Sequence, residues 1–317
     1  HYLFEKLFRE PAQQRAQWTP QQLEERVAAL VEGYARENLG GLELLSGREK
    51  YRLSRLVQSA CKLIRHVEEE LAQSRFVPEK LEWGLGAGRD APPLRIPTAK
   101  GTVTVGGTID RVDVYTSPSG ERYVRVIDYK TGKKAFHLAD ALYGLNMQML
   151  VYLAALVEHS PEAPAGILYM PAAEPSVSVE RGAGEEKIKE EADKQLKMSG
   201  VVLSDQEIIQ AMEAGARGNF IPASLNKDGS LGRYSSTLDR EGLQTVLAYV
   251  KRVVATMGEA LLEGRVEAAP HLKNRSACRY CPYSPVCGKE FTAKDVELDK
   301  TTPQQALEKM RETLEKG

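Results

Sequence analysis

The chain has 317 residues, 42% of them hydrophobic, which is enough to bury the core of one large or two ordinary domains. Lys and Arg (43) almost balance Asp and Glu (44). The net charge of -1 excludes a uniformly basic nucleic-acid-binding protein, so any such contact must come from local patches. No apolar run approaches the roughly 18 residues of a membrane span, and no charged-then-apolar leader opens the chain. We expect a soluble, cytoplasmic, globular protein without membrane contact.

The first quarter of the chain has helical periodicity. Between Thr19 and about Ser74, apolar residues recur every three or four positions, as at Leu53, Val57 and Ile64. Segment 1–75 is therefore predicted to be the helical N-terminal part of the protein.

The hydrophobic period changes after Pro78. The expected elements are a strand (81–85), a loop (84–97), two alternating strands (101–115 and 123–129) around the turn 117–120, a helix (about 138–158) and a buried strand (165–170). Helices followed by a hairpin, a helix and a strand predict an α/β fold with a small mixed central sheet flanked by helices. We assign this core to segment 76–175.

The remaining chain is predicted to be mostly helical. Segment 176–265 should contain a charged helix (185–198), a short helix (205–214) and a long helix (240–263). Segment 266–317 contains a cysteine cluster and a final helix (303–315) that Thr302 caps. The sequence has no internal repeat.

Two charged residues end the second predicted strand, in Val126-Ile127-Asp128-Tyr129-Lys130-Thr131-Gly132. Alternation along a strand places Asp128 and Lys130 on the same side as Val124 and Val126. A buried carboxylate without a partner costs several kcal/mol, so Asp128 requires a cation beside it: Lys130, a metal ion, or both.

A second acid, Asp110, ends the segment Gly106 to Asp110 on the preceding strand. A hairpin loop of three or five residues would place Asp110 opposite Asp128, and a loop of four would place it opposite Ile127; we predict the first register. Two carboxylates and the Tyr129 carbonyl are an oxygen set that Mg²⁺ accepts, and Lys130 would face the same phosphate. This predicts metal-assisted phosphodiester hydrolysis. The alternative is a surface turn with an ordinary ion pair.

Gln148 and Tyr152 lie four residues apart in the next predicted helix and so share a face. They could hold a DNA backbone or satisfy each other's hydrogen bonds.

Three of the four cysteines form Cys278-x₂-Cys281-x₅-Cys287 in a polar loop. Three thiolates at this spacing favour zinc or an iron-sulfur cluster, but a zinc ribbon would have a second C-x₂-C pair. The fourth cysteine, Cys61, falls in a helical apolar stripe, where a free cysteine behaves as a small hydrophobic residue.

These motifs occur in a recognisable order. Gly107-Thr108-Ile109-Asp110-Arg111-Val112-Asp113, then Asp128 to Gly132, then Gln148-Met149-Leu150-Val151-Tyr152 resemble the PD-(D/E)XK nuclease module of the RecB family. With the cysteine cluster, the chain is similar over nearly its whole length to the C-terminal nuclease region of AddB-type subunits of helicase-nucleases. The resemblance implies a restriction-endonuclease-like core. It also implies that Asp110 and Asp128 bind the metal, that Lys130 is catalytic, and that Gln148 and Tyr152 support the site.

Two further features follow from the same resemblance. The family has a Gly-x-x-x-His motif whose histidine joins the metal shell, and His1 fits the end of that motif. The family also carries a [4Fe-4S] cluster on cysteines that correspond to Cys278, Cys281 and Cys287. Motif order places the fourth cluster ligand upstream of residue 1 and makes Cys61 the less favoured candidate. Such a cluster would hold the C-terminal segment over the nuclease fold.

The function implied by the resemblance is a Mg²⁺-dependent DNA exonuclease domain. It would degrade one strand of DNA, the one running 5' to 3', as duplex ends are unwound during double-strand break resection and recombinational repair. The expected partners are DNA and an AddA-type helicase-nuclease subunit that completes the heterodimer. No G-x-x-x-x-G-K-[ST] motif occurs, so this segment should not hydrolyse ATP. Two alternatives remain: a non-catalytic DNA-binding scaffold with a structural cluster, and a zinc-stabilised RNA nuclease.

Overall fold

The computed structural model describes residues 1–132, 134–180, 182–265, 271–272, 278, 281–287 and 296–316. A mixed sheet forms its centre, with six strands in the order β1-β4-β5-β6-β7-β8. These strands are β1 (Val77–Leu85), β4 (Gly107–Thr116), β5 (Arg122–Lys130), β6 (Ala163–Pro171), β7 (Ser199–Leu203) and β8 (Thr237–Leu238). Separate two-stranded pairs are β2 (Leu94–Thr98) with β3 (Gly101–Val105), and β9 (His271–Leu272) with β10 (Val296–Glu297). The predicted α/β class is confirmed.

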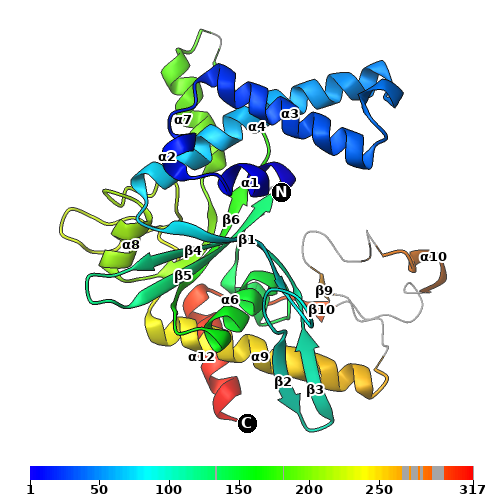
Figure 1. Cartoon of the computed structure of the whole chain (residues 1–317). Coiled ribbons are helices and arrows are strands. Elements are labelled where there is room, and N and C mark those ends of the chain that lie inside the picture. The colour runs from blue at the N-terminus through cyan, green and yellow to red at the C-terminus, as the bar shows by residue number, and fades with distance from the viewer. Residues whose placement is uncertain are drawn as a thin grey trace.

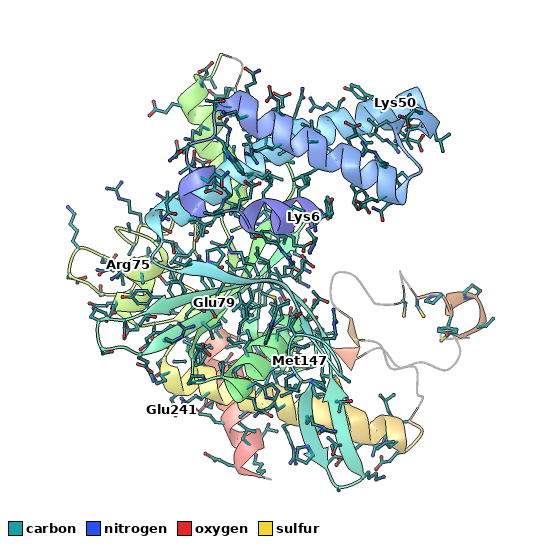
Figure 2. The ribbon with its side chains drawn as sticks, viewed as in Figure 1. Lys6, Lys50, Arg75, Glu79, Met147 and Glu241 are labelled. Atoms are coloured by element: carbon teal, nitrogen blue, oxygen red, sulfur yellow. The ribbon has the colours of Figure 1, made fainter. Side chains whose placement is uncertain are left out.

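Helices cover the sheet on two sides (Figure 1). Above it in that view lie α1 (Tyr2–Phe8), α2 (Ala12–Arg15), α3 (Pro20–Asn38), the 3-10 turn η1 (Leu42–Leu44), α4 (Gly47–Gln73) and α7 (Glu185–Leu196). Below it lie α6 (Gln148–His159), α9 (Arg240–Leu262) and α12 (Pro303–Glu315). Figure 2 shows the same two layers, with Lys6 of α1 above the sheet and Met147, which precedes α6, below it. The described residues also include the short helices α5 (Leu138–Ala141), α8 (Gln206–Met212) and α10 (Ser284–Cys287).

The predicted N-terminal helical region is a hairpin of α3 and α4. Each helix begins with a capping box, Thr19 with Gln22 and Ser46 with Glu49, in which side chain and backbone exchange hydrogen bonds. The apolar stripe of α4 packs inward, and its buried residues are Val57, Ala60, Leu63, Ile64 and Val67. In the described part of the chain, no helix combines the length and apolar character needed to cross a bilayer.

Two predicted strand and loop boundaries are wrong around Gly106. The single strand expected at 101–115 is two strands, β3 and β4, because β3 turns away to pair with β2. Strand β2 lies in the segment expected to be a loop. A Cβ atom at Gly106 would lie 2.8 Å from the Leu85 carbonyl oxygen, so this close crossing requires glycine.

The helix expected at 138–158 is also wrong in detail. It is divided into α5 and α6 by Gly144 (φ 70°) and Asn146 (φ 55°), both in the left-handed region. The charged helix ends at Leu196, before the expected Met198, because the chain enters β7. Helices α8, α9 and α12 lie where the sequence predicts them, and Thr302 caps α12.

The hairpin of β4 and β5 has the predicted register. Thr116 pairs with Arg122, which leaves a five-residue loop, and Arg111 pairs with Ile127. The next position along this register places Asp110 opposite Asp128. Strand β6 then pairs with β5 in parallel, so β5 lies inside the sheet with its carboxyl end beside the start of β4.

Candidate active site

Three carboxylates form a row across three adjacent strands. Strand β1 pairs with β4 through Leu81↔Arg111 and Trp83↔Ile109, so Glu82 lies opposite Asp110. Asp110 in turn lies opposite Asp128 on β5. Glu82 has a φ of 47°, an uncommon conformation for a residue with a side chain, and this turns its backbone locally out of the regular strand. The register of two strand pairs thus gathers three acids at one edge of the fold.

His1 lies beside two of these acids. Its Nδ1 atom is 3.2 Å from Asp110 Oδ1 and 3.4 Å from Glu82 Oε1. One ligand atom from each of the three residues falls within 4.8 Å of the others, the only such grouping of potential metal ligands among the described residues. The structure therefore brings together His1 and Asp110, both predicted from the sequence, and adds Glu82, which was not predicted from the sequence.

Asp110 is electrostatically unusual. Burial raises the pKa of its carboxyl group to about 7; the hydrogen bond from the Tyr129 backbone opposes this rise, and the negative charge of Asp128 adds to it. The Tyr129 N–H donates to Asp110 Oδ2 at 2.8 Å, which leaves Oδ1 directed toward His1. A cation bound beside this carboxyl group would stabilise its ionised form.

Lys130 forms an ion pair with Asp128. The Nζ atom is 2.6 Å from Asp128 Oδ2, although the angles are not those of a regular hydrogen bond. The Asp128 side chain is only 6% exposed, whereas that of Lys130 is 32% exposed. The lysine head can therefore contact both the buried acid and a ligand that approaches from solvent.

Tyr129, between these two residues, fixes the strand that carries them. Its ring stacks on Phe4 of α1 at a centroid distance of 4.3 Å and meets His1 edge-on at 6.1 Å. Its hydroxyl accepts a hydrogen bond from Arg111 at 3.4 Å, and burial raises its pKa to about 12. One side chain thus connects β5 to the helix that bears His1.

A fully buried group of four charged side chains lies on the Tyr129 side of the sheet. Arg111 contacts Asp113 through two bonds of 2.7 Å and Glu70 at 3.1 Å. Arg125 contacts Asp113 at 2.9 Å and Glu70 at 2.6 Å. Two guanidinium groups and two carboxylates neutralise one another, which is the condition for burying such charges. We call Glu70, Arg111, Asp113 and Arg125 the buried tetrad; it joins α4 to β4 and β5.

Gln148 and Tyr152 contact each other on the other side of the sheet. Gln148 Nε2 donates to the Tyr152 hydroxyl at 3.3 Å. A Cβ atom at Gly107 would lie 2.3 Å from that hydroxyl, so Tyr152 packs directly on the start of β4. The second of the two predicted alternatives, mutual hydrogen bonding, is present in the structure, and their predicted role in supporting the site remains a prediction.

The donor set fits a magnesium ion. It offers the carboxylates of Asp110, Asp128 and Glu82, and oxygen ligands are the ones that Mg²⁺ prefers. Burial is the main cause of the raised pKa of Asp110, and the nearby charges of Asp128 and Glu82 add to it, so a bound cation would favour the ionised form of this carboxyl group. Participation of His1 and of the Tyr129 carbonyl as ligands remains a prediction.

The cysteines divide into two environments. The Cys281 N–H donates to the Cys278 carbonyl at 3.3 Å, so these two cysteines lie close together, and Cys287 ends α10. Cys61 instead packs against the core from α4, and burial raises the pKa of its thiol. Partial burial against apolar side chains disfavours the thiolate that a metal requires, and the hydrophobic role of Cys61 stays a prediction.

Comparison with known proteins identifies the fold. A profile of the PD-(D/E)XK nuclease superfamily matches residues 1–288. The chain belongs to the PD-(D/E)XK nuclease superfamily. Within this superfamily, it matches the C-terminal part of AddB subunits.

Three relatives show how far the match to AddB subunits extends; each is the B-type subunit of an ATP-dependent helicase/deoxyribonuclease. The relative from Caldanaerobacter subterraneus is 37% identical over 78% of this chain and 22% of its own length. The one from Clostridium novyi is 36% identical over 92% of this chain and 26% of its own length. The one from Alkaliphilus oremlandii is 31% identical over 99% of this chain and 29% of its own length. This PD-(D/E)XK chain therefore spans about a quarter of the length of the relatives it matches.

Proposed function

We propose that the chain is the Mg²⁺-dependent deoxyribonuclease domain of an AddB-type subunit. The observation that carries the proposal is the strand register, which aligns Glu82, Asp110 and Asp128 and sets Lys130 beside them. Superfamily membership and the names of the relatives support the reaction and the DNA substrate.

In this proposal, Asp110 and Asp128 hold the magnesium ion, with Glu82, His1 and the Tyr129 carbonyl as further ligands. When bound, the ion would lower the pKa of a coordinated water and neutralise charge on the phosphate. The Tyr129 N–H keeps the Asp110 carboxylate oriented. Lys130 Nζ, held by Asp128 but exposed on its far side, orients the nucleophile and stabilises negative charge that develops on the phosphate.

The biological setting follows from the relatives and is part of the proposal. The domain would degrade one strand of DNA, the one running 5' to 3', while an AddA-type partner and the remainder of the AddB-type polypeptide unwind duplex ends for recombinational repair. The described site contains acids and a lysine suited to a phosphodiester, and the sequence has no G-x-x-x-x-G-K-[ST] motif for ATP hydrolysis.

The test is a cleavage assay with linear DNA and Mg²⁺. Asp128→Asn and Lys130→Gln keep side-chain size and should each reduce the rate by roughly 10²-fold or more while the fold is retained. Lys62→Gln is the matched control, because Lys62 is an exposed lysine of α4 paired with Glu174. Variants that cut DNA at the parental rate would refute the site. A parent that binds DNA without cutting it would instead favour the scaffold alternative, and faster cleavage of RNA would favour the RNA nuclease.

We also propose that Cys278, Cys281 and Cys287 bind a [4Fe-4S] cluster and that Cys61 does not. The hydrogen bond that joins Cys281 to Cys278 and the partial burial of Cys61 support this assignment. Iron and sulfide analysis should show loss of both elements in Cys278→Ser and parental content in Cys61→Ser. Loss of iron in Cys61→Ser would overturn the assignment, and zinc in place of iron would overturn the cluster type.

A further inference from the structure

An arginine on the loop that follows β1 is held against the strand that carries Asp110. Arg89 Nη1 donates to the Gly107 carbonyl at 3.0 Å, and Nη2 donates to Thr108 Oγ1 at 2.8 Å. The residue is nevertheless exposed. In the part of the chain that the structure describes, no carboxylate forms an ion pair with it. A guanidinium has five N–H donors, so donors remain for a ligand.

The loop is shaped to place this side chain. Gly84 N–H donates to Asp90 Oδ2 at 2.7 Å, and the backbone of Ala91 bonds to Gly84 and Gly86 at 3.0 and 2.9 Å. These bonds fold the loop back over β1. A Cβ atom at Gly84 would lie 2.6 Å from Arg89 Nε, and one at Gly86 would lie 3.0 Å from Arg89 Cδ. Both glycines therefore leave space in which the arginine lies flat on the strand.

The position of the guanidinium relative to the acids follows from strand alternation. Gly84 pairs with Thr108, which lies two residues before Asp110 on β4. Residues two apart on a strand share a face and are about 7 Å apart, at a rise of about 3.3 Å per residue. Arg89 thus lies on the same face as the row of carboxylates and close to it, but it forms no ion pair with any of the three acids.

We propose that Arg89 binds the DNA backbone phosphate next to the one that is cleaved. This inference rests on the proposed nuclease function, and it names a residue that positions the DNA strand along β4. A guanidinium anchored by two neutral acceptors keeps its full charge for an anion, and its planar fork suits phosphate oxygens. The carboxylates would hold the metal that contacts the scissile phosphate, and the Thr108 end of the site binds its neighbour.

If Arg89 only held the loop in place, removal of its charge would leave the salt dependence of DNA binding unchanged. Arg89→Gln keeps an amide that can donate to the Gly107 carbonyl but removes the charge. The experiment measures binding of a fluorescent single-stranded oligodeoxynucleotide to the 317-residue chain carrying Lys130→Gln, with and without Arg89→Gln, over a range of salt concentrations. Arg36→Gln on α3, which removes an exposed arginine paired with Glu32, is the control.

The expected result is about tenfold weaker binding at low salt for Arg89→Gln, because a charged hydrogen-bonded contact is lost. The slope of log affinity against log salt should fall by about 0.7, the contribution of one phosphate contact in single strands. Arg89→Lys should retain most of the slope. In the cleavage-competent chain, KM should rise while kcat changes little.

An unchanged salt slope in Arg89→Gln, or a loss of affinity that only follows a loss of melting temperature, would overturn the proposal. These outcomes are separable from failure of the nuclease function, because binding is measured without cleavage. A parent chain that does not cut DNA while Arg89→Gln lowers the slope would refute the nuclease and leave the phosphate contact in place.

Discussion

Removing the charge of Glu70 should be among the most destabilising conservative changes in the chain. Glu70 accepts bonds of 3.1 Å from Arg111 and 2.6 Å from Arg125, and all three side chains are 0% exposed. The substitution Glu70→Gln preserves volume but leaves two buried guanidinium groups with one carboxylate, Asp113. Breaking one partner from a buried ion pair costs about 3–5 kcal/mol, because the remaining charge stays desolvated.

The assay is urea denaturation of the metal-free chain, with Glu32→Gln as the control. Glu32 pairs with Arg36 at 3.2 Å, but both side chains are more than half exposed, so its loss should cost at most about 0.5 kcal/mol. A second variant separates charge from packing: Glu70→Met with Arg125→Met removes one charge of each sign and should be more stable than Glu70→Gln alone. If Glu70→Gln costs less than about 1 kcal/mol, the tetrad does not hold the charges as the structure indicates.

Two further expectations concern stability. The pKa of Asp110 is about 7 in the folded chain, above its ordinary value, so the folded state binds the proton more tightly and loses stability as pH rises toward 7. In EDTA, Asp110→Asn should therefore be more stable than the parent chain at pH 8, by up to about 4 kcal/mol, and the difference should be smaller at pH 5. Thermal melts at both pH values measure this difference. The same stability difference at the two pH values would contradict the prediction. Gly200→Ala should lower the free energy of unfolding, measured by urea denaturation, by about 2–3 kcal/mol, because the new Cβ would lie 2.0 Å from the Ile167 carbonyl oxygen. Gly33→Ala in α3 is the control: no atom lies within 4 Å of its Cβ, so it should raise the free energy of unfolding by about 0.5–1 kcal/mol.

The part of the site that lies in one hairpin could be predicted from the sequence. Strand alternation and a five-residue loop are both local, and together they determine that Asp110 faces Asp128 and that Lys130 follows on the same side. Even there, the alternatives of metal site and simple ion pair could not be separated by spacing alone. The ordered motifs and their resemblance to RecB-family nucleases favoured the metal site, which stays a prediction.

The contributions from distant segments could not be predicted in the same way. Glu82 reaches Asp110 through the pairing of β1 with β4, and the β2–β3 hairpin intervenes between those strands in the chain. Glu70 looked like one of three consecutive acids near the end of a helix, and only the packing of α4 on the sheet shows that it is the buried one. Strands β7 and β8 were missed because they are short and their pairing is remote in sequence.

The order of strands also bears on how the chain folds. The three strands that carry the acids are antiparallel neighbours, whereas β5 and β6 pair only after the crossover through α6. Antiparallel pairs of low sequence separation lose less loop entropy on closing than a parallel crossover does. We therefore expect the β4–β5 hairpin to form early. Asp110 and Asp128 would then face each other before β1 and the rest of the sheet join them, and divalent ions present during refolding should accelerate the formation of the hairpin by relieving the repulsion between these two charges.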